Sequence, residues 1–168
     1  MLSFLFRGLT AEKPGGAALF DALTEQARQP HWYVEGSVPD TLDGRFAVLA
    51  SIVALALVRL EREGEKGDRL SVALTERFIH VMESEHRELG LGDPTLGKTV
   101  RKLVGMLGRR TELRRSATHA NWAETVRESL YKDDVGEGAL RHSTAALKAL
   151  AKRIEATPLA DLEQGNIS

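Results

Sequence analysis

One string in the sequence matches a motif with known chemistry. Gly92-Asp-Pro-Thr-Leu-Gly97-Lys98-Thr99 fits the phosphate-binding loop pattern of glycine, four residues, then Gly-Lys-Ser/Thr. In that motif, backbone N–H groups and the lysine hold the phosphates, and the hydroxyl binds magnesium. The motif must follow a buried strand, whereas residues 75–89 have the periodicity of a charged helix. We therefore expect a corner between two helices, with a nucleotide-binding protein as the alternative.

Other residues that could catalyse a reaction or hold a metal are sparse. Glu83 and His86 have the i, i+3 spacing of half a di-iron site, but the sequence has no second Glu-x-x-His pair. The absence of cysteine excludes disulfides, thiolate metal sites and cysteine nucleophiles. No serine stands in a nucleophile-elbow string. The sequence therefore predicts a protein that is not an enzyme and binds no metal or cofactor.

A basic stripe is the first of two features that favour binding. Residues 98–115 contain seven basic residues and one acidic residue, whereas the whole chain has 23 Lys+Arg and 24 Asp+Glu. At 100° per residue, four of these cations share one side of a helix; we call them the basic face: Lys98, Arg101, Lys102 and Arg109. Such a face binds phosphate in lipid headgroups or RNA, or an acidic protein surface. A helical RNA-binding or membrane-surface module is thus a further alternative. The sequence shows no second basic surface, so we expect no binding to DNA.

The second feature is an aromatic loop over residues 31–39, which contains Trp32, Tyr33 and Pro39. Large aromatic side chains beside a turn have two alternative roles. They form a hydrophobic docking edge for a partner, or they fold down onto the core of their own domain. The sequence leaves both alternatives open.

Helical periodicity predicts the elements that must position these features. We expect helices to cover, in order, residues 17–29, 41–60, 69–89, 93–115, 122–130 and 138–156. Asp40 is the predicted N-cap of the second helix, and an Asn121-Trp-Ala-Glu124 capping box should open the fifth. The longest apolar run, Phe46–Val58, is shorter than the roughly 20 residues that cross a bilayer, so it predicts a buried central helix.

These elements predict an all-α fold, a single compact domain of five to six helices around an apolar central helix. A chain of 168 residues suits one domain. We expect a flexible N-terminal segment over residues 1–16, a helical domain over 17–157 and a polar C-terminal tail over 158–168. The apolar N-terminus lacks the charged region and cleavage site of a secretory signal, so the expected location is the cytoplasm.

Three strings together resemble one protein family. They are Gln29-Pro-His-Trp-Tyr33, Val38-Pro-Asp-Thr-Leu-Asp-Gly-Arg-Phe46, and Arg87-Glu-Leu-Gly-Leu-Gly-Asp93 followed by Lys98. They are similar to the ubiquinol–cytochrome c chaperone family, over about residues 17–131, and the second string is long enough to be specific. The residues of these strings that we assign to partner binding or to the motif are Trp32, Tyr33, Pro39, Asp40, Asp43, Arg45 and Asp93.

The resemblance implies a helical, non-enzymatic assembly factor for the respiratory complex that oxidises ubiquinol and reduces cytochrome c. It implies a protein client, newly made cytochrome b, which the chaperone holds for haem loading and assembly. The ribosome or an anionic membrane surface is the expected second partner, and a place on the periphery of the inner membrane follows. The short N-terminus predicts a bacterial-type member of the family.

Overall fold

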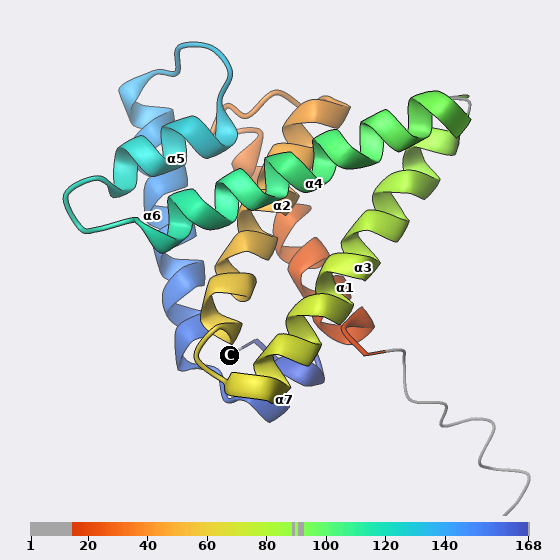
Figure 1. Ribbon diagram of the computed structural model, residues 1–168. Coiled ribbons are helices and arrows are strands. Elements are labelled where there is room, and N and C mark those ends of the chain that lie inside the picture. The colour runs from red at the N-terminus through yellow and green to blue at the C-terminus, as the bar shows by residue number, and fades with distance from the viewer. Residues whose placement is uncertain (1–14, 89, 91–92, 168) are drawn as a thin grey trace, which may run out of the picture.

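The computed structural model describes residues 15–88, 90 and 93–167, and these residues form helices and no strand (Figure 1). The elements are α1 (Ala17–Ala27), a 3-10 helix η1 (Pro30–Trp32), α2 (Leu42–Leu60), α3 (Gly64–Glu88), α4 (Asp93–Arg115), α5 (Trp122–Leu130), α6 (Glu137–Ala156) and α7 (Leu159–Glu163). The predicted all-α class is confirmed. The described residues contain seven α-helices, one more than the upper predicted number.

Helix α2 is the centre of the fold, as predicted. Residues 46–56 are buried without interruption, and α1, α3, α4, α5 and α6 all pack against this helix (Figure 1). A helix that is apolar on every side is stable only when other elements cover it. Ser51 satisfies its hydroxyl inside this run by donating to the carbonyl oxygen of Ala47 at 2.7 Å. None of the described helices combines the length and apolarity that a bilayer span requires.

The N-cap of α2 is Thr41, so the prediction of Asp40 is wrong by one residue. Thr41 Oγ1 accepts a hydrogen bond from the Gly44 N–H at 3.2 Å. Asp40 instead accepts from Arg45 Nε at 2.7 Å, outside the helix end. The backbone before α2 folds so tightly over the first turn that a Cβ on Gly44 would overlap the carbonyl oxygen of Pro39. This close approach explains why glycine stands in the string Val38–Phe46.

Helix α3 begins at Gly64, although the periodicity predicted Arg69. The charged residues after α2 form the exposed side of the first turns of α3, and only residues 61–63 connect the two helices. Gly64 has a φ of 59°, which favours glycine at this reversal. A Cβ on Gly67 would overlap the carbonyl oxygen of Leu60, so the two helices approach closely here.

The predicted capping box of α5 is also wrong. Asn121 is the N-cap residue, but its side chain makes no hydrogen bond to the helix. Its Oδ1 accepts from the Thr118 N–H at 2.6 Å and so closes the loop before the helix. The last long helix starts at Glu137, one residue before the predicted start.

The predicted polar tail over 158–168 is wrong for the part that the structure describes. Residues Leu159–Glu163 form α7, and Leu162 is fully buried. Gly165, with a φ of 76°, lets the chain pass close to the backbone of Ala18 in α1. The end of the chain therefore belongs to the domain. Of the predicted N-terminal segment, residues 1–14 lie outside the described residues, whereas Gly16 is buried against α3.

The tight start of α2 generates a first prediction. Gly44→Ala should lower the free energy of unfolding by about 1–3 kcal/mol, because the new methyl group must displace the Pro39 backbone. Gly105→Ala is the matched control, since a Cβ there meets nothing within 4 Å. In the middle of α4 it should raise the free energy by up to about 1 kcal/mol. Urea unfolding of both variants measures the difference, and equal effects would contradict this account of Gly44.

Two histidines link η1 to α6. Nδ1 of His31 lies 3.0 Å from Nε2 of His142, a distance at which one ring donates and the other accepts. Burial, and secondly the charge that His142 can carry, lower the pKa of His31. Because the pKa of His31 is lower in the folded than in the unfolded chain, the unfolded chain takes up the proton first as the pH falls. The neutral pair therefore contributes its full stabilisation above pH ~6.5, and the free energy of unfolding decreases as the pH falls from there through the folded pKa.

We therefore predict that acidification from pH ~7.5 to ~5.5 destabilises the wild type more than His31→Asn. The melting temperature at the two pH values measures this. His80→Asn, at an exposed position on α3, should retain the wild-type pH dependence. An identical drop in His31→Asn and the wild type would show that the pair does not sense pH.

Candidate functional site

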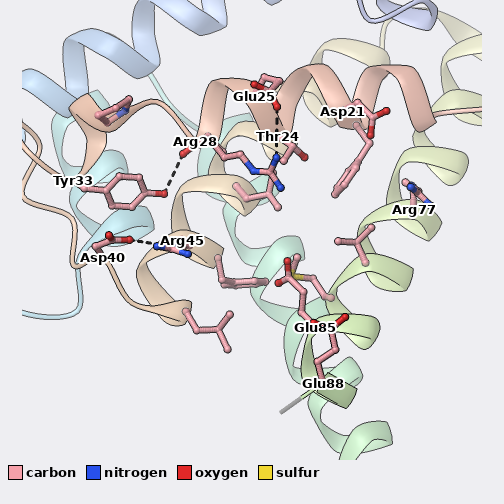
Figure 2. Close-up of a pocket in the computed structure, with 18 of the residues that line it drawn as sticks. Asp21, Thr24, Glu25, Arg28, Tyr33, Asp40, Arg45, Arg77, Glu85 and Glu88 are labelled. Carbon is pink, nitrogen blue, oxygen red and sulfur yellow. Dashed lines mark hydrogen bonds and ion pairs between the residues drawn. The ribbon is translucent and has the colours of Figure 1, made fainter. Parts of the chain in front are cut away.

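A groove of about 1120 Å³ lies between α1, residues 30–34, the start of α2 and α3; we call it the α1–α3 groove (Figure 2). Apolar side chains at the edge of the core line it, among them Phe20, Leu42, Phe46, Leu49, Val81 and Met82. Charged side chains also line it: Asp21, Glu25, Arg28, Asp40, Arg45, Arg77, Glu85 and Glu88. A groove with both kinds of side chain fits an amphipathic polypeptide segment.

Exposed apolar side chains gather at this groove. The described residues contain four large hydrophobic side chains that are exposed, and two of them, Val34 and Leu42, line the groove. Val34 is 70% exposed and Leu42 is 41% exposed. Exposed apolar side chains that line a groove favour contact with a partner, because the partner removes them from water.

Two ion pairs neutralise charges at the rim, one at the start of α2 and one at the end of α1. Arg45 donates to Asp40 at 2.7 Å, and Arg28 lies 3.6 Å from Glu25 (Figure 2). The hydrogen bond from Arg45 lowers the pKa of Asp40. These pairs join side chains on one wall each, so they leave the groove open between the walls.

The α3 wall carries two exposed carboxylates, Glu85 and Glu88, and a buried donor of Arg77. Glu85 and Glu88 form no ion pair with any described residue. Nε of Arg77 is buried and has no hydrogen-bond partner within the described chain. A buried donor without an acceptor lowers stability by about 1–3 kcal/mol. A partner that supplies an acceptor to Arg77 or a cation to the two glutamates would gain binding energy at this wall.

The structure divides the two aromatic residues of the loop between the two alternatives. Trp32 is 2% exposed, and its Nε1–H donates to the carbonyl oxygen of Gln26 at 2.8 Å. Trp32 therefore folds onto the core, which is the second of the two alternatives for the loop, and its assignment to partner binding or to the motif stays a prediction. Tyr33 is half-buried on the groove wall, and its hydroxyl donates to the carbonyl oxygen of Ala27 at 3.1 Å. Burial raises the pKa of Tyr33, so the hydroxyl stays a donor.

The other residues of the family strings separate. Asp40 and Arg45 line the groove beside Tyr33 (Figure 2). Asp43 faces a different neighbour, Lys132 in the segment before α6, and this hydrogen bond lowers the pKa of Asp43. Pro39 is exposed. Asp93 is the first residue of α4, and its side chain lies outside the description.

The basic face does not line this groove. All four of its side chains are exposed on α4. Arg109 pairs with Glu128 at 2.7 Å, whereas the other three form no ion pair within the described chain. Leu103 and Leu107 are buried on the opposite side of α4, whereas Val104 is 40% exposed.

The elements around the phosphate-loop string do not provide the strand that a nucleotide site requires. Helix α3 precedes the string. Lys98 and Thr99, the last two residues of the string, lie inside α4. Gly92 lies outside the described residues. No group of three metal-ligating side chains occurs in the described part of the chain. His86 Nδ1 lies 2.7 Å from the carbonyl oxygen of Met82, within its own helix, rather than facing a metal.

Sequence reasoning missed the two long walls of the groove. On α3, Arg77, Val81, Glu85 and Glu88 follow one another at helical spacing and form a stripe beside the buried side of the helix. On α1, Asp21, Glu25 and Arg28 do the same. The sequence signal for these walls was a stripe of mixed charged and apolar residues beside the buried side of each helix. The same stripe occurs on helices that face only solvent, so it does not indicate a groove until the position of the neighbouring helix is known.

The free donor of Arg77 generates a prediction. Arg77→Met keeps the length of the side chain and removes the buried N–H, so the free energy of unfolding should stay equal or rise by up to about 1 kcal/mol. Arg59→Met is the control, because Arg59 donates to the carbonyl oxygens of Glu155 and Thr157. That change should lower the free energy by about 1–3 kcal/mol. Urea unfolding decides, and a clear destabilisation by Arg77→Met would mean that Arg77 supports the fold.

Comparison with known proteins places this geometry in a family. A profile described as ubiquinol-cytochrome C chaperone matches residues 35–168. Among solved structures, the chain is similar to one described as the crystal structure of the Cbp3 homolog from Brucella abortus, with a TM-score of 0.77 and 25% sequence identity, covering 100% of this chain and 96% of that chain. A comparison with curated proteins finds no match. The profile covers α2 through α7 and includes Asp40, Arg45 and the α3 wall of the groove, and the chain therefore belongs to the ubiquinol–cytochrome c chaperone family.

Proposed function

We propose that this protein is a non-enzymatic assembly chaperone of the ubiquinol–cytochrome c reductase complex, and that it holds newly made cytochrome b in the α1–α3 groove. One observation carries the proposal: a chain of this chaperone family has an open groove lined by exposed apolar side chains, exposed carboxylates and a buried arginine donor without a partner in the described chain. A chaperone needs such a surface, because it must bind a client tightly enough to protect it and still release it.

The chemistry of the groove suits a client destined for a membrane. Such a polypeptide exposes apolar stretches with lysine and arginine near their cytoplasmic ends. The apolar stretch would cover Val34 and Leu42, and its flanking cations would approach Glu85 and Glu88 on α3. Covering about 100 Å² of apolar surface stabilises a complex by about 2.5 kcal/mol, which suits a reversible contact.

A binding role fits the lining better than a catalytic one. Asp40 and Glu25 are each held by an arginine, and the Tyr33 hydroxyl is used by the Ala27 carbonyl. None of the described lining residues forms the pair of nucleophile and general base that covalent catalysis requires.

The basic face is part of this proposal as a second contact. Lys98, Arg101 and Lys102 extend an exposed cationic surface along α4, which suits the anionic headgroups of a membrane or the phosphates of a ribosome. We therefore place the chaperone in the cytoplasm, on the periphery of the inner membrane where the client is inserted.

The groove generates a prediction for client binding. The double variant Val34→Glu, Leu42→Glu should reduce the cytochrome b that co-purifies with the tagged protein from its native host by about tenfold or more, since both side chains would stay hydrated. The control is Val72→Glu, a change at a 58% exposed position on α3 that does not line the groove. Quantitative mass spectrometry of the purified material measures the client.

Two results would contradict the proposal. Failure of cytochrome b to co-purify with the wild type would exclude the proposed client. Equal recovery with the groove variant and with Val72→Glu would exclude the groove as its site. Circular dichroism of both variants shows that the helices are intact, as exposed positions should allow.

A further inference from the structure

A second pocket, of about 610 Å³, lies where the end of α4, the loop before α5 and the last turns of α6 meet. We call it the α4–α6 pocket. Four of its lining side chains are cationic and one is a carboxylate: Arg62, Arg114, Lys148, Lys152 and Glu155. Trp122 and three alanines provide an apolar part of the lining. A pocket of this size accommodates a small molecule or a lipid headgroup.

The positive charge in this pocket is not neutralised by the protein. Glu155 pairs with Arg62, so the carboxylate is already in use. Arg114, Lys148 and Lys152 form no ion pair with any residue that the structure describes. The whole chain has a formal charge of −1, so three free cations around one pocket are a local concentration rather than a general excess.

Arg114 is held in place without using its hydrogen-bond donors. Its guanidinium carbon lies over the Trp122 ring, 4.6 Å from the ring centre, a distance at which a cation–π interaction holds the group against the ring. Its buried Nε has no hydrogen-bond partner, and its other two nitrogens have no acceptor among the described residues. Burial, and secondly the charge of Arg62, lower the pKa of Arg114.

A neighbouring arginine shows what a structural role looks like in the same helix. Arg110, one turn earlier in α4, donates from Nε to the carbonyl oxygen of Ser129 at 3.0 Å and from a terminal nitrogen to that of Met106 at 3.1 Å. Arg110 thus uses its donors inside the protein, whereas Arg114 keeps its donors for an acceptor from outside.

We propose that the α4–α6 pocket binds a phosphate-bearing ligand, with Arg114, Lys148 and Lys152 as its cationic contacts. A phosphate monoester carries about −1.5 to −2 charges at pH 7 and three acceptor oxygens, so it matches several cations better than a single carboxylate does. The planar guanidinium donates in pairs to phosphate oxygens, and lysines add charge from the side. The volume leaves room beside Trp122 for more than one phosphate group.

This site is independent of the proposed client groove and of the basic face. Its residues come from the α2–α3 connection, the end of α4, the start of α5 and α6, and none of them lines the α1–α3 groove. Loss of phosphate binding would therefore leave the client proposal standing, and loss of client binding would leave this one.

Calorimetric titration with inorganic pyrophosphate at low salt tests the proposal. We expect saturable binding to the wild type that weakens about tenfold or more in Lys152→Gln and in Lys148→Gln, because each change removes a charge-assisted contact. Lys66→Gln removes one positive charge at an exposed position on α3 and should bind like the wild type. Arg114→Met should lose binding as well, and the two exposed lysines keep the test valid if that variant is unstable.

Flotation with vesicles separates the two sources of phosphate. Binding to phosphatidylcholine vesicles that contain cardiolipin, weakened in Lys152→Gln but kept in Lys66→Gln, identifies a lipid headgroup as the ligand. Variant-sensitive binding of pyrophosphate, together with vesicle binding that Lys152→Gln leaves unchanged, identifies a soluble phosphorylated ligand, because the separate basic face accounts for such vesicle binding. The proposal is overturned if the wild type binds neither probe, or if neither Lys148→Gln nor Lys152→Gln weakens the binding of either probe.

Discussion

The burial of residues 46–56 of α2 on every side is the constraint on which the rest of the structure depends. A helix that is buried from residue 46 to residue 56 is stable only when every side is covered. Five other helices therefore each pack one face against it. Each fully buried large side chain contributes about 1.5–3 kcal/mol relative to exposure, which makes this helix the main source of stability. The packing helices are left with their outer faces for other contacts. The α1–α3 groove and the α4–α6 pocket both lie where such outer faces meet at the edge of this packing.

The parts of the fold that depend on composition could be predicted from the sequence, and the parts that depend on one or two atoms could not. Apolar periodicity identified α2 and the all-α class, because burial of a whole face leaves a signal over many residues. Asp40 and Thr41 are both good capping residues, and the close approach of Gly44 to Pro39 decides between them. The end of the chain has few apolar residues, so the single buried Leu162 could not reveal that α7 belongs to the domain.

The sequence could predict only one wall of the α1–α3 groove, the wall formed by the loop and the start of α2. The string Val38–Phe46 pointed to Asp40 and Arg45, and the aromatic loop pointed to Tyr33, and all three line the groove. The walls from α1 and α3 come from residues 20–28 and 77–88, outside this string, and their charges look like ordinary solvated positions until the helices are packed. Trp32 shows the same limit of prediction, because the sequence does not indicate whether a tryptophan in a loop is buried or exposed. The two sites also differ in their electrostatics: ion pairs within the walls neutralise part of the groove, whereas three of the four cations that line the pocket form no ion pair with the described residues.

Site-specific photo-crosslinking tests the central claim, that the α1–α3 groove holds the client, most directly. A photoreactive amino acid placed at Val34 lies on the groove, and the same group placed at Val72 lies on α3 outside it. During synthesis of cytochrome b, the account predicts that the client is crosslinked from position 34 and not from position 72. Crosslinks from position 72 alone, or equally from both, would contradict it.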